Sequence, residues 1–291
     1  MTMSHTEAGN VEANRDRRLI ALAAVAIHLS IGSIYAYSIY QLPLEEAQGW
    51  ATSQVTLAFS IAVFVLGLTA AFLGTYVEEY GPRLAGLAAA VLYGAGMVGA
   101  GLSVQIGSLP LFLATFGFVG GMGIGLGYIS PIGTLLEWFP DRRGMATGLA
   151  VMGFGAGALL TGPLGSYLIQ EFSVATAFYG LGALYFVLMT LGASYLAKPA
   201  DGWLPEGMQD EEDAHEKATS ALPGIETLTA AEARTSTRFW MVWLVIFINV
   251  SAGIMLLAFA SPMLQQIGGA TATTAAFITG YIGIFNGGGR I

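Results

Sequence analysis

The sequence predicts an all-helical membrane protein that crosses the bilayer several times. Of its 291 residues, 55% are hydrophobic and only 10% are charged, whereas about 25% of residues are charged in an average soluble domain. A helix needs about 20 apolar residues to span the hydrocarbon core. The chain contains seven complete runs of this length and an eighth that reaches its last residue. This pattern excludes an ordinary soluble enzyme.

Six of the eight predicted spans lie in about the first two thirds of the chain. In order, they are residues 19–40, 54–77, 84–104, 109–136, 145–169, 174–197, 239–263 and 275–291. We therefore expect four parts, which are a polar tail (1–18), a six-helix domain (19–197), an acidic linker (198–238) and a partial second domain (239–291). No polar flank follows the eighth run, so we expect the chain to be the front of a longer protein.

The positive charges lie at one end of the predicted spans. Every Lys and Arg except Arg290 lies in the tail, after the second or fourth span, or in the linker. The connections after the first, third, fifth and seventh spans contain none. By the positive-inside rule, the N-terminus is expected in the cytoplasm and the protein in the plasma membrane, with the lipid bilayer as its surroundings. The net charge of -8 gives no reason to expect a nucleic-acid partner.

The connection after the second span carries a loop motif. Gly74, an acidic residue at Glu78, then Gly81 and Arg83 resemble the loop signature of the major facilitator superfamily. Gly81 followed by Pro82 suits a tight turn. We expect this loop to take part in the conformational change of a transporter.

A second motif lies between the fourth and fifth spans, and a third lies in the eighth. The second runs from Trp138 to Gly148, and the third from Phe285 to Arg290. Together they resemble the oxalate/formate antiporter family of the major facilitator superfamily, and this resemblance extends over the whole chain. It implies conformational roles for the charged residues of the second motif, which are Asp141, Arg142 and Arg143.

The resemblance implies a fold and a function. The fold is the major facilitator fold, with a complete six-helix N-terminal half and the first two helices of the C-terminal half. The function is secondary transport of small organic anions by alternating access, in which one carboxylate is exchanged for another. Such a protein is not an enzyme and needs neither cofactor nor metal. The chain contains no Cys and no phosphate-binding loop ending in Lys-Ser or Lys-Thr, and no obligatory protein partner is evident.

Arg290 is the strongest candidate for substrate binding. It lies about 13 residues into the eighth span, so about 20 Å along a helix. A guanidinium at that depth costs at least about 2.5 kcal/mol unless an anion or a water-filled cavity receives it. Its planar fork of donors matches a carboxylate. The resemblance implies that Arg290 binds the substrate carboxylate in a central cavity, and that a second cation lies beyond residue 291.

Two tyrosines and a histidine complete the candidate site. The resemblance implies that Tyr35 and Tyr128 surround the substrate with their rings. His28, Gly32 and Tyr35 fall on one face of a helix. His28 is either a proton shuttle, which would couple transport to the proton gradient, or a hydrogen-bonded packing residue. Tyr37 is more simply read as interface packing.

Glycines in the fourth and fifth spans have a structural explanation. Those at 117–127 resemble a phosphate-binding loop only superficially, because no strand precedes them. With those at 153–157, they are expected to let helices approach closely.

Two other functions remain open from the residues. One is proton-coupled monocarboxylate symport, which uses the same fold. The other is a truncated membrane subunit that inserts into the bilayer but transports nothing.

Overall fold

The computed structural model describes residues 15–200, 202–205, 208 and 230–288. All regular secondary structure in these ranges is helical. Seven helical stretches are long and apolar enough to cross a membrane. The predicted all-helical membrane protein is confirmed.

The first span joins three helical segments of different winding. It consists of α2 (Arg17–Ile31), the 3-10 helix η1 (Gly32–Tyr40) and α3 (Gln41–Gln48). The prediction ended this span at residue 40. The helix instead continues through a polar segment to Gly49, whose φ of 67° ends it.

The other helices follow the predicted order. They are α4 (Thr52–Tyr80), α5 (Pro82–Gln105), α6 (Leu109–Phe112), the π-helix η2 (Leu113–Gly120), α7 (Gly121–Trp138), η3 (Pro140–Arg142), α8 (Arg143–Glu171), α9 (Val174–Tyr195), α11 (Ala230–Thr235), α12 (Thr237–Gln266) and α13 (Ala272–Gly288).

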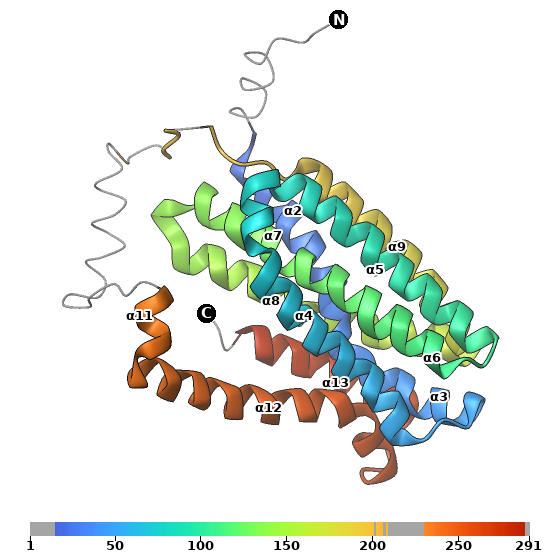
Figure 1. Cartoon of the computed structure of the whole chain (residues 1–291). Helices are drawn as coiled ribbons and strands as arrows, with labels where there is room; N and C mark the ends of the chain where they lie inside the picture. Colours follow the sequence, from blue (N-terminus) through green and yellow to red (C-terminus); the bar gives the residue numbers. More distant parts are fainter. Residues whose placement is uncertain (1–14, 201, 206–207, 209–229, 289–291) are drawn as a thin grey trace, which may run out of the picture.

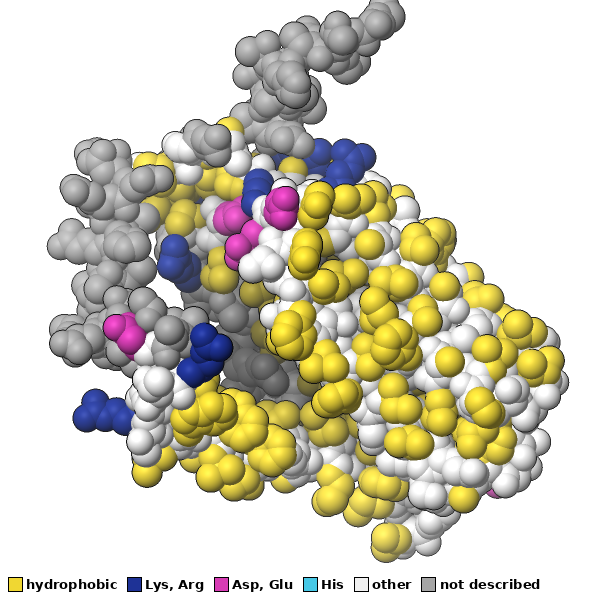
Figure 2. Space-filling view, in the orientation of Figure 1, with side chains coloured by type: hydrophobic (Ala, Val, Ile, Leu, Met, Phe, Trp, Pro, Cys, Tyr) yellow, Lys and Arg dark blue, Asp and Glu magenta, His cyan; other side chains and the backbone are white. Residues whose placement is uncertain are grey.

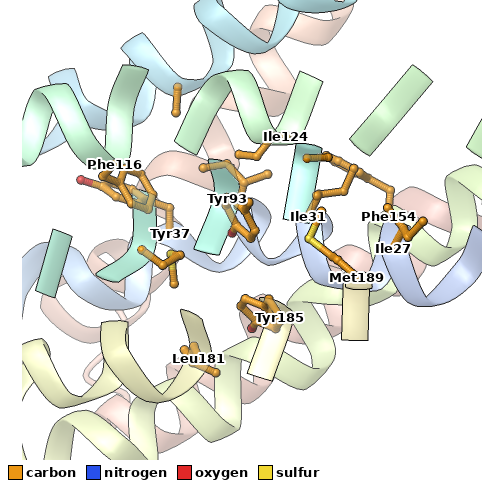
Figure 3. Packing of buried hydrophobic residues seen from close by; sticks show 14 of the residues in the cluster. Ile27, Ile31, Tyr37, Tyr93, Phe116, Ile124, Phe154, Leu181, Tyr185 and Met189 are labelled. Atoms are coloured by element: carbon orange, nitrogen blue, oxygen red, sulfur yellow. The ribbon is translucent and has the colours of Figure 1, made fainter. Parts of the chain in front are cut away.

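The helices form two groups. In the first group, α5 packs along α9 and α7, α4 packs against α7, and α2 contacts α7, α8 and α9. The second group is α12 and α13, which meets the first where α13 lies along α8 and α12 contacts η1 (Figure 1). The core of the first group combines aliphatic side chains with aromatic rings, among them Tyr93 and Tyr185, whose rings stack with their centroids 6.0 Å apart (Figure 3).

Glycines let the helices approach to backbone contact. A Cβ atom at Gly123 of α7 would lie 2.4 Å from the backbone nitrogen of Tyr93, and one at Gly157 of α8 would lie 2.4 Å from the carbonyl oxygen of Leu29. Both distances are too short for any side chain. The predicted role of these glycines in close helix packing is confirmed.

The two ends of the helices differ in charge. We name the end where α2 begins the basic face, because it holds every described Lys and Arg residue. The opposite end is the acidic face, with Glu45, Glu46 and Glu171. Figure 2 shows a hollow between the two groups of helices, open at the side where the Lys, Arg, Asp and Glu side chains gather.

Candidate functional site

An aromatic cluster lies where α2, η1, α7 and α8 meet. The ring of Phe154 lies 4.8 Å from that of Tyr35, 5.6 Å from that of Tyr128 and 6.5 Å from that of His28, measured between centroids. All three contacts are edge-to-face, a favourable arrangement for aromatic rings. We call these four residues the Phe154 cluster. The structure therefore brings together three residues that were predicted separately.

The four rings differ in exposure. Phe154 is 5% exposed and His28 is fully buried. Tyr35 and Tyr128 are half-buried, so each presents part of its ring outside the core. Phe154 is the member that sequence reasoning missed, because one Phe in an apolar run carries no distinguishing signal.

His28 links the first span to the fourth. Its Nε2 atom lies 3.2 Å from the carbonyl oxygen of Tyr128. Since a carbonyl only accepts, Nε2 is the donor and carries the proton. Nδ1 is then an acceptor, and it is buried without a hydrogen-bond partner in the described part of the chain. His28 thus fixes the backbone at Tyr128 and leaves one basic nitrogen inside the cluster.

The 3-10 winding of η1 brings Tyr35 to the cluster. Gly32 and Tyr35 lie on one side because three residues make a full turn of a 3-10 helix. A Cβ atom at Gly32 would lie 1.8 Å from the carbonyl oxygen of Phe154. Tyr37 lies on another side, where its hydroxyl donates to the carbonyl of Val55 at 2.6 Å, so it belongs to the core.

The second group of helices reaches the backbone beside this cluster. A Cβ atom at Gly283 of α13 would lie 2.2 Å from the carbonyl oxygen of Gly155, the residue after Phe154. Arg290, the predicted carboxylate ligand, lies outside the described residues.

The first predicted loop is a tight turn between α4 and α5. Gly81 has a φ of 86°, a backbone conformation that favours glycine, and Pro82 then begins α5. The Glu78 carbonyl accepts a hydrogen bond from Lys198 Nζ at 2.7 Å. Arg83 is exposed. A Cβ atom at Gly74 would have no heavy atom within 4 Å, so no contact in the described part requires a glycine there.

The second predicted loop is held by a residue of the polar tail. Asp141 forms ion pairs with Arg17 and, at 3.6 Å, with Arg142. Arg17 Nε also donates to the carbonyl of Trp138 at 2.8 Å. Arg143 begins α8 and is exposed. Arg17 was not predicted to take part.

Trp138 attaches the segment after α9 to the same loop. Its Nε1 donates to the carbonyl of Ala197 at 2.7 Å, and its ring lies 4.9 Å from that of Trp203. The basic face of the first group is therefore a connected set of hydrogen bonds and ring contacts rather than independent loops.

The described residues contain no candidate metal site. No group of three His, Asp or Glu side chains that could hold a metal occurs among them. What the Phe154 cluster presents instead is aromatic surface, backbone carbonyls and one imidazole nitrogen, a set that suits binding of a small organic molecule.

Two groups of membrane-spanning helices, with an aromatic cluster beside their contact, are the features of a helical membrane protein that crosses the bilayer several times. The model of the Major Facilitator Superfamily matches residues 20–291, so the chain belongs to that family of transporters and is not an enzyme. The crystal structure of a D-xylose-proton symporter matches with a TM-score of 0.60 at 19% identity, covering 94% of this chain and 66% of that one. The predicted major facilitator fold is confirmed.

The curated relatives are distant. The chain is 25% identical to the oxalate:formate antiporter of Oxalobacter formigenes, over 93% of this chain and 60% of the relative. It is 22% identical to YhjX, an uncharacterized MFS-type transporter of Escherichia coli (strain K12), over 95% and 65%. It is 26% identical to monocarboxylate transporter 14 of Mus musculus, over 72% and 39%. The chain thus spans less than two thirds of the length of these relatives.

Proposed function

We propose that this protein transports small carboxylates by alternating access and exchanges one for another. The observation that carries the proposal is the Phe154 cluster, in which Tyr35 and Tyr128 present half-buried rings beside the contact between the two groups of helices. The distant relation to an oxalate:formate antiporter supports a carboxylate as the cargo.

In this proposal the two groups of helices have different tasks. The Phe154 cluster receives the carbon skeleton and the planar faces of the substrate. The charge is met by Arg290, whose guanidinium binds a carboxylate with two parallel hydrogen bonds. Rocking of the groups about the α8–α13 contact then exposes the substrate to either side of the membrane.

The two loops on the basic face move with the first group. Because Asp141 pairs with Arg17, and Lys198 reaches the Glu78 carbonyl, each loop is tied to another helix end of that group. The positive charges of this face support a cytoplasmic position for it in a plasma-membrane protein.

Proton-coupled monocarboxylate symport is the second candidate. This candidate rests on the buried Nδ1 of His28, an acceptor without a hydrogen-bond partner in the described part of the chain, where a transported proton would have to bind. The relation to monocarboxylate transporter 14 supports a monocarboxylate as the cargo.

Proteoliposomes containing the purified protein separate these functions. Exchange predicts uptake of labelled oxalate, formate or pyruvate only when unlabelled carboxylate is inside, with no pH gradient. Symport predicts uptake into empty vesicles when the outside is acidic, and loss of that uptake in His28→Gln. A protein that inserts stably and shows neither activity is a non-transporting subunit, and the proposal is then wrong.

The role of Arg290 is tested in the same vesicles. Arg290→Gln is expected to abolish exchange while insertion into the membrane stays normal. Arg18→Gln is the matched control, since it removes an exposed Arg from the basic face. Undiminished exchange in Arg290→Gln contradicts the role of this residue.

A further inference from the structure

Two buried tyrosines in the core of the first group have no part in the proposed function as stated so far. Tyr93 of α5 and Tyr185 of α9 are both buried, and their rings stack with centroids 6.0 Å apart (Figure 3). A buried hydroxyl in a membrane protein has to find its hydrogen-bond partners within the protein. The partners of these two hydroxyls lie on the elements that carry Tyr35 and Phe154.

The Tyr93 hydroxyl donates to η1. Ser33 Oγ donates to the carbonyl oxygen of Ser30 at 2.6 Å. Since a hydroxyl has a single proton, the hydrogen bond between Ser33 Oγ and the Tyr93 hydroxyl has Tyr93 as its donor. Ser33 lies two residues before Tyr35 in η1. This bond therefore ties α5 to the short segment that brings Tyr35 to the Phe154 cluster.

The Tyr185 hydroxyl donates to α8 in the same way. Thr161 Oγ1 donates to the carbonyl oxygen of Gly157 at 2.7 Å. The hydrogen bond between Thr161 Oγ1 and the Tyr185 hydroxyl, also 2.7 Å long, therefore has Tyr185 as its donor. Gly157 lies three residues after Phe154 in α8. The second tyrosine thus holds the helix that carries Phe154.

Backbone contact closes this set of interactions into a circuit. A Cβ atom at Gly157 would lie 2.6 Å from the carbonyl carbon of Gly32, so α8 and η1 touch without a side chain between them. Gly32 is the residue before Ser33, where the hydrogen bonds began. We call the connected residues the tyrosine circuit, in the order Ser33, Tyr93, Tyr185, Thr161, Gly157 and Gly32.

We propose that Tyr93 and Tyr185 are positioning residues that set the spacing of Tyr35 and Phe154, and thereby the affinity for the substrate. This inference rests on the proposed function. Tyr35 and Phe154 lie on η1 and α8, with their ring centroids 4.8 Å apart. The tyrosine circuit joins the same two elements through hydroxyls that are themselves buried in the core. Loss of either hydroxyl opens the circuit.

Substitution by Phe removes each hydroxyl and keeps the stacked rings. Tyr93→Phe and Tyr185→Phe are each expected to raise KM for carboxylate exchange about threefold or more, with a smaller change in kcat. The double variant should resemble either single variant, because one missing bond already opens the circuit, whereas independent hydroxyls would give additive effects. Tyr37→Phe is the matched control, since it removes a buried hydrogen bond from η1 to the Val55 carbonyl outside the circuit. Its KM should equal that of the parent protein.

Thermal unfolding of the same variants in detergent separates failure of this inference from failure of the proposed function. If the parent protein exchanges no carboxylate, the transport proposal fails, and the unfolding temperatures decide the circuit. Equal reductions in both single variants and the double variant support it, and additive reductions overturn it. Ser33→Ala and Thr161→Val, which remove the acceptors, replace a tyrosine variant that does not fold.

With an active parent protein, KM decides. The inference is overturned if Tyr93→Phe and Tyr185→Phe keep the parent KM, if their effects on KM add in the double variant, or if Tyr37→Phe raises KM as much as they do.

Discussion

Replacing Gly32 by Ala tests whether backbone contact between η1 and α8 builds the site. The added Cβ atom would lie 1.8 Å from the carbonyl oxygen of Phe154. Because the contact is with backbone, no side-chain rotation relieves it, and the two helices must separate by at least about 1.6 Å to reach an ordinary van der Waals distance of 3.4 Å. Overpacking of this kind costs about 1–3 kcal/mol. The separation also moves Tyr35 away from the ring of Phe154.

The assay is thermal unfolding in detergent together with substrate exchange. Gly32→Ala should lower the apparent melting temperature by about 2–8 °C and reduce exchange. Gly133→Ala is the matched control, since a Cβ atom there has no heavy atom within 4 Å. Because Ala has a higher helix propensity than Gly, the stability of Gly133→Ala should equal that of the parent protein or exceed it by up to about 1 kcal/mol. If Gly32→Ala is as stable and active as the parent protein, close backbone contact does not position the Phe154 cluster.

Three further substitutions address the ring contacts and the basic face. Phe154→Leu loses three edge-to-face ring contacts, worth about 0.5–1.5 kcal/mol each, and should lower both the melting temperature and the rate of exchange; a variant that melts earlier but exchanges at the parent rate would show that Phe154 has only a structural role. Trp138→Phe removes the hydrogen bond to the Ala197 carbonyl and should lower the free energy of unfolding by about 1 kcal/mol. An unchanged free energy of unfolding would show that this bond does not hold the segment after α9 in place. Arg17→Gln should destabilise the chain more than Arg18→Gln, since within the described part of the chain Arg17, unlike Arg18, has a carboxylate and a carbonyl partner for its side chain; equal melting temperatures for the two variants would contradict this.

The spans were predictable because their signal is local. Twenty consecutive apolar residues identify a spanning helix whatever surrounds it. The winding of the helices was not predictable, because an apolar run looks the same for α, 3-10 and π geometry. In η1 the winding accompanies contacts with distant residues, such as that of Ser33 Oγ with the hydroxyl of Tyr93. These contacts exist only after the helices have packed.

The candidate site was predicted in part. Tyr35, Tyr128 and His28 were identified from the first and fourth spans, and the structure places their rings around one centre. Phe154 was missed because its importance arises from its position between them, which no local pattern encodes. The pair of Arg17 with Asp141 joins residues 124 positions apart, and the sequence showed only that both lie at one membrane surface.

The 3-10 winding of η1 also makes the first span longer than an α-helix with the same number of residues. A 3-10 helix rises about 2.0 Å per residue and an α-helix about 1.5 Å, so the nine residues of η1 extend about 4–5 Å further than they would in an α-helix. Rewinding them as an α-helix would retract the acidic-face end of the span by that distance and turn each residue about 20° relative to the one before it. Ser38 would then move away from Ser261, and the hydrogen bond from the Ser261 backbone nitrogen to Ser38 Oγ would be lost. The contact between the first span and α12 therefore depends on the 3-10 winding of η1, through both the length and the rotation that this winding gives the span.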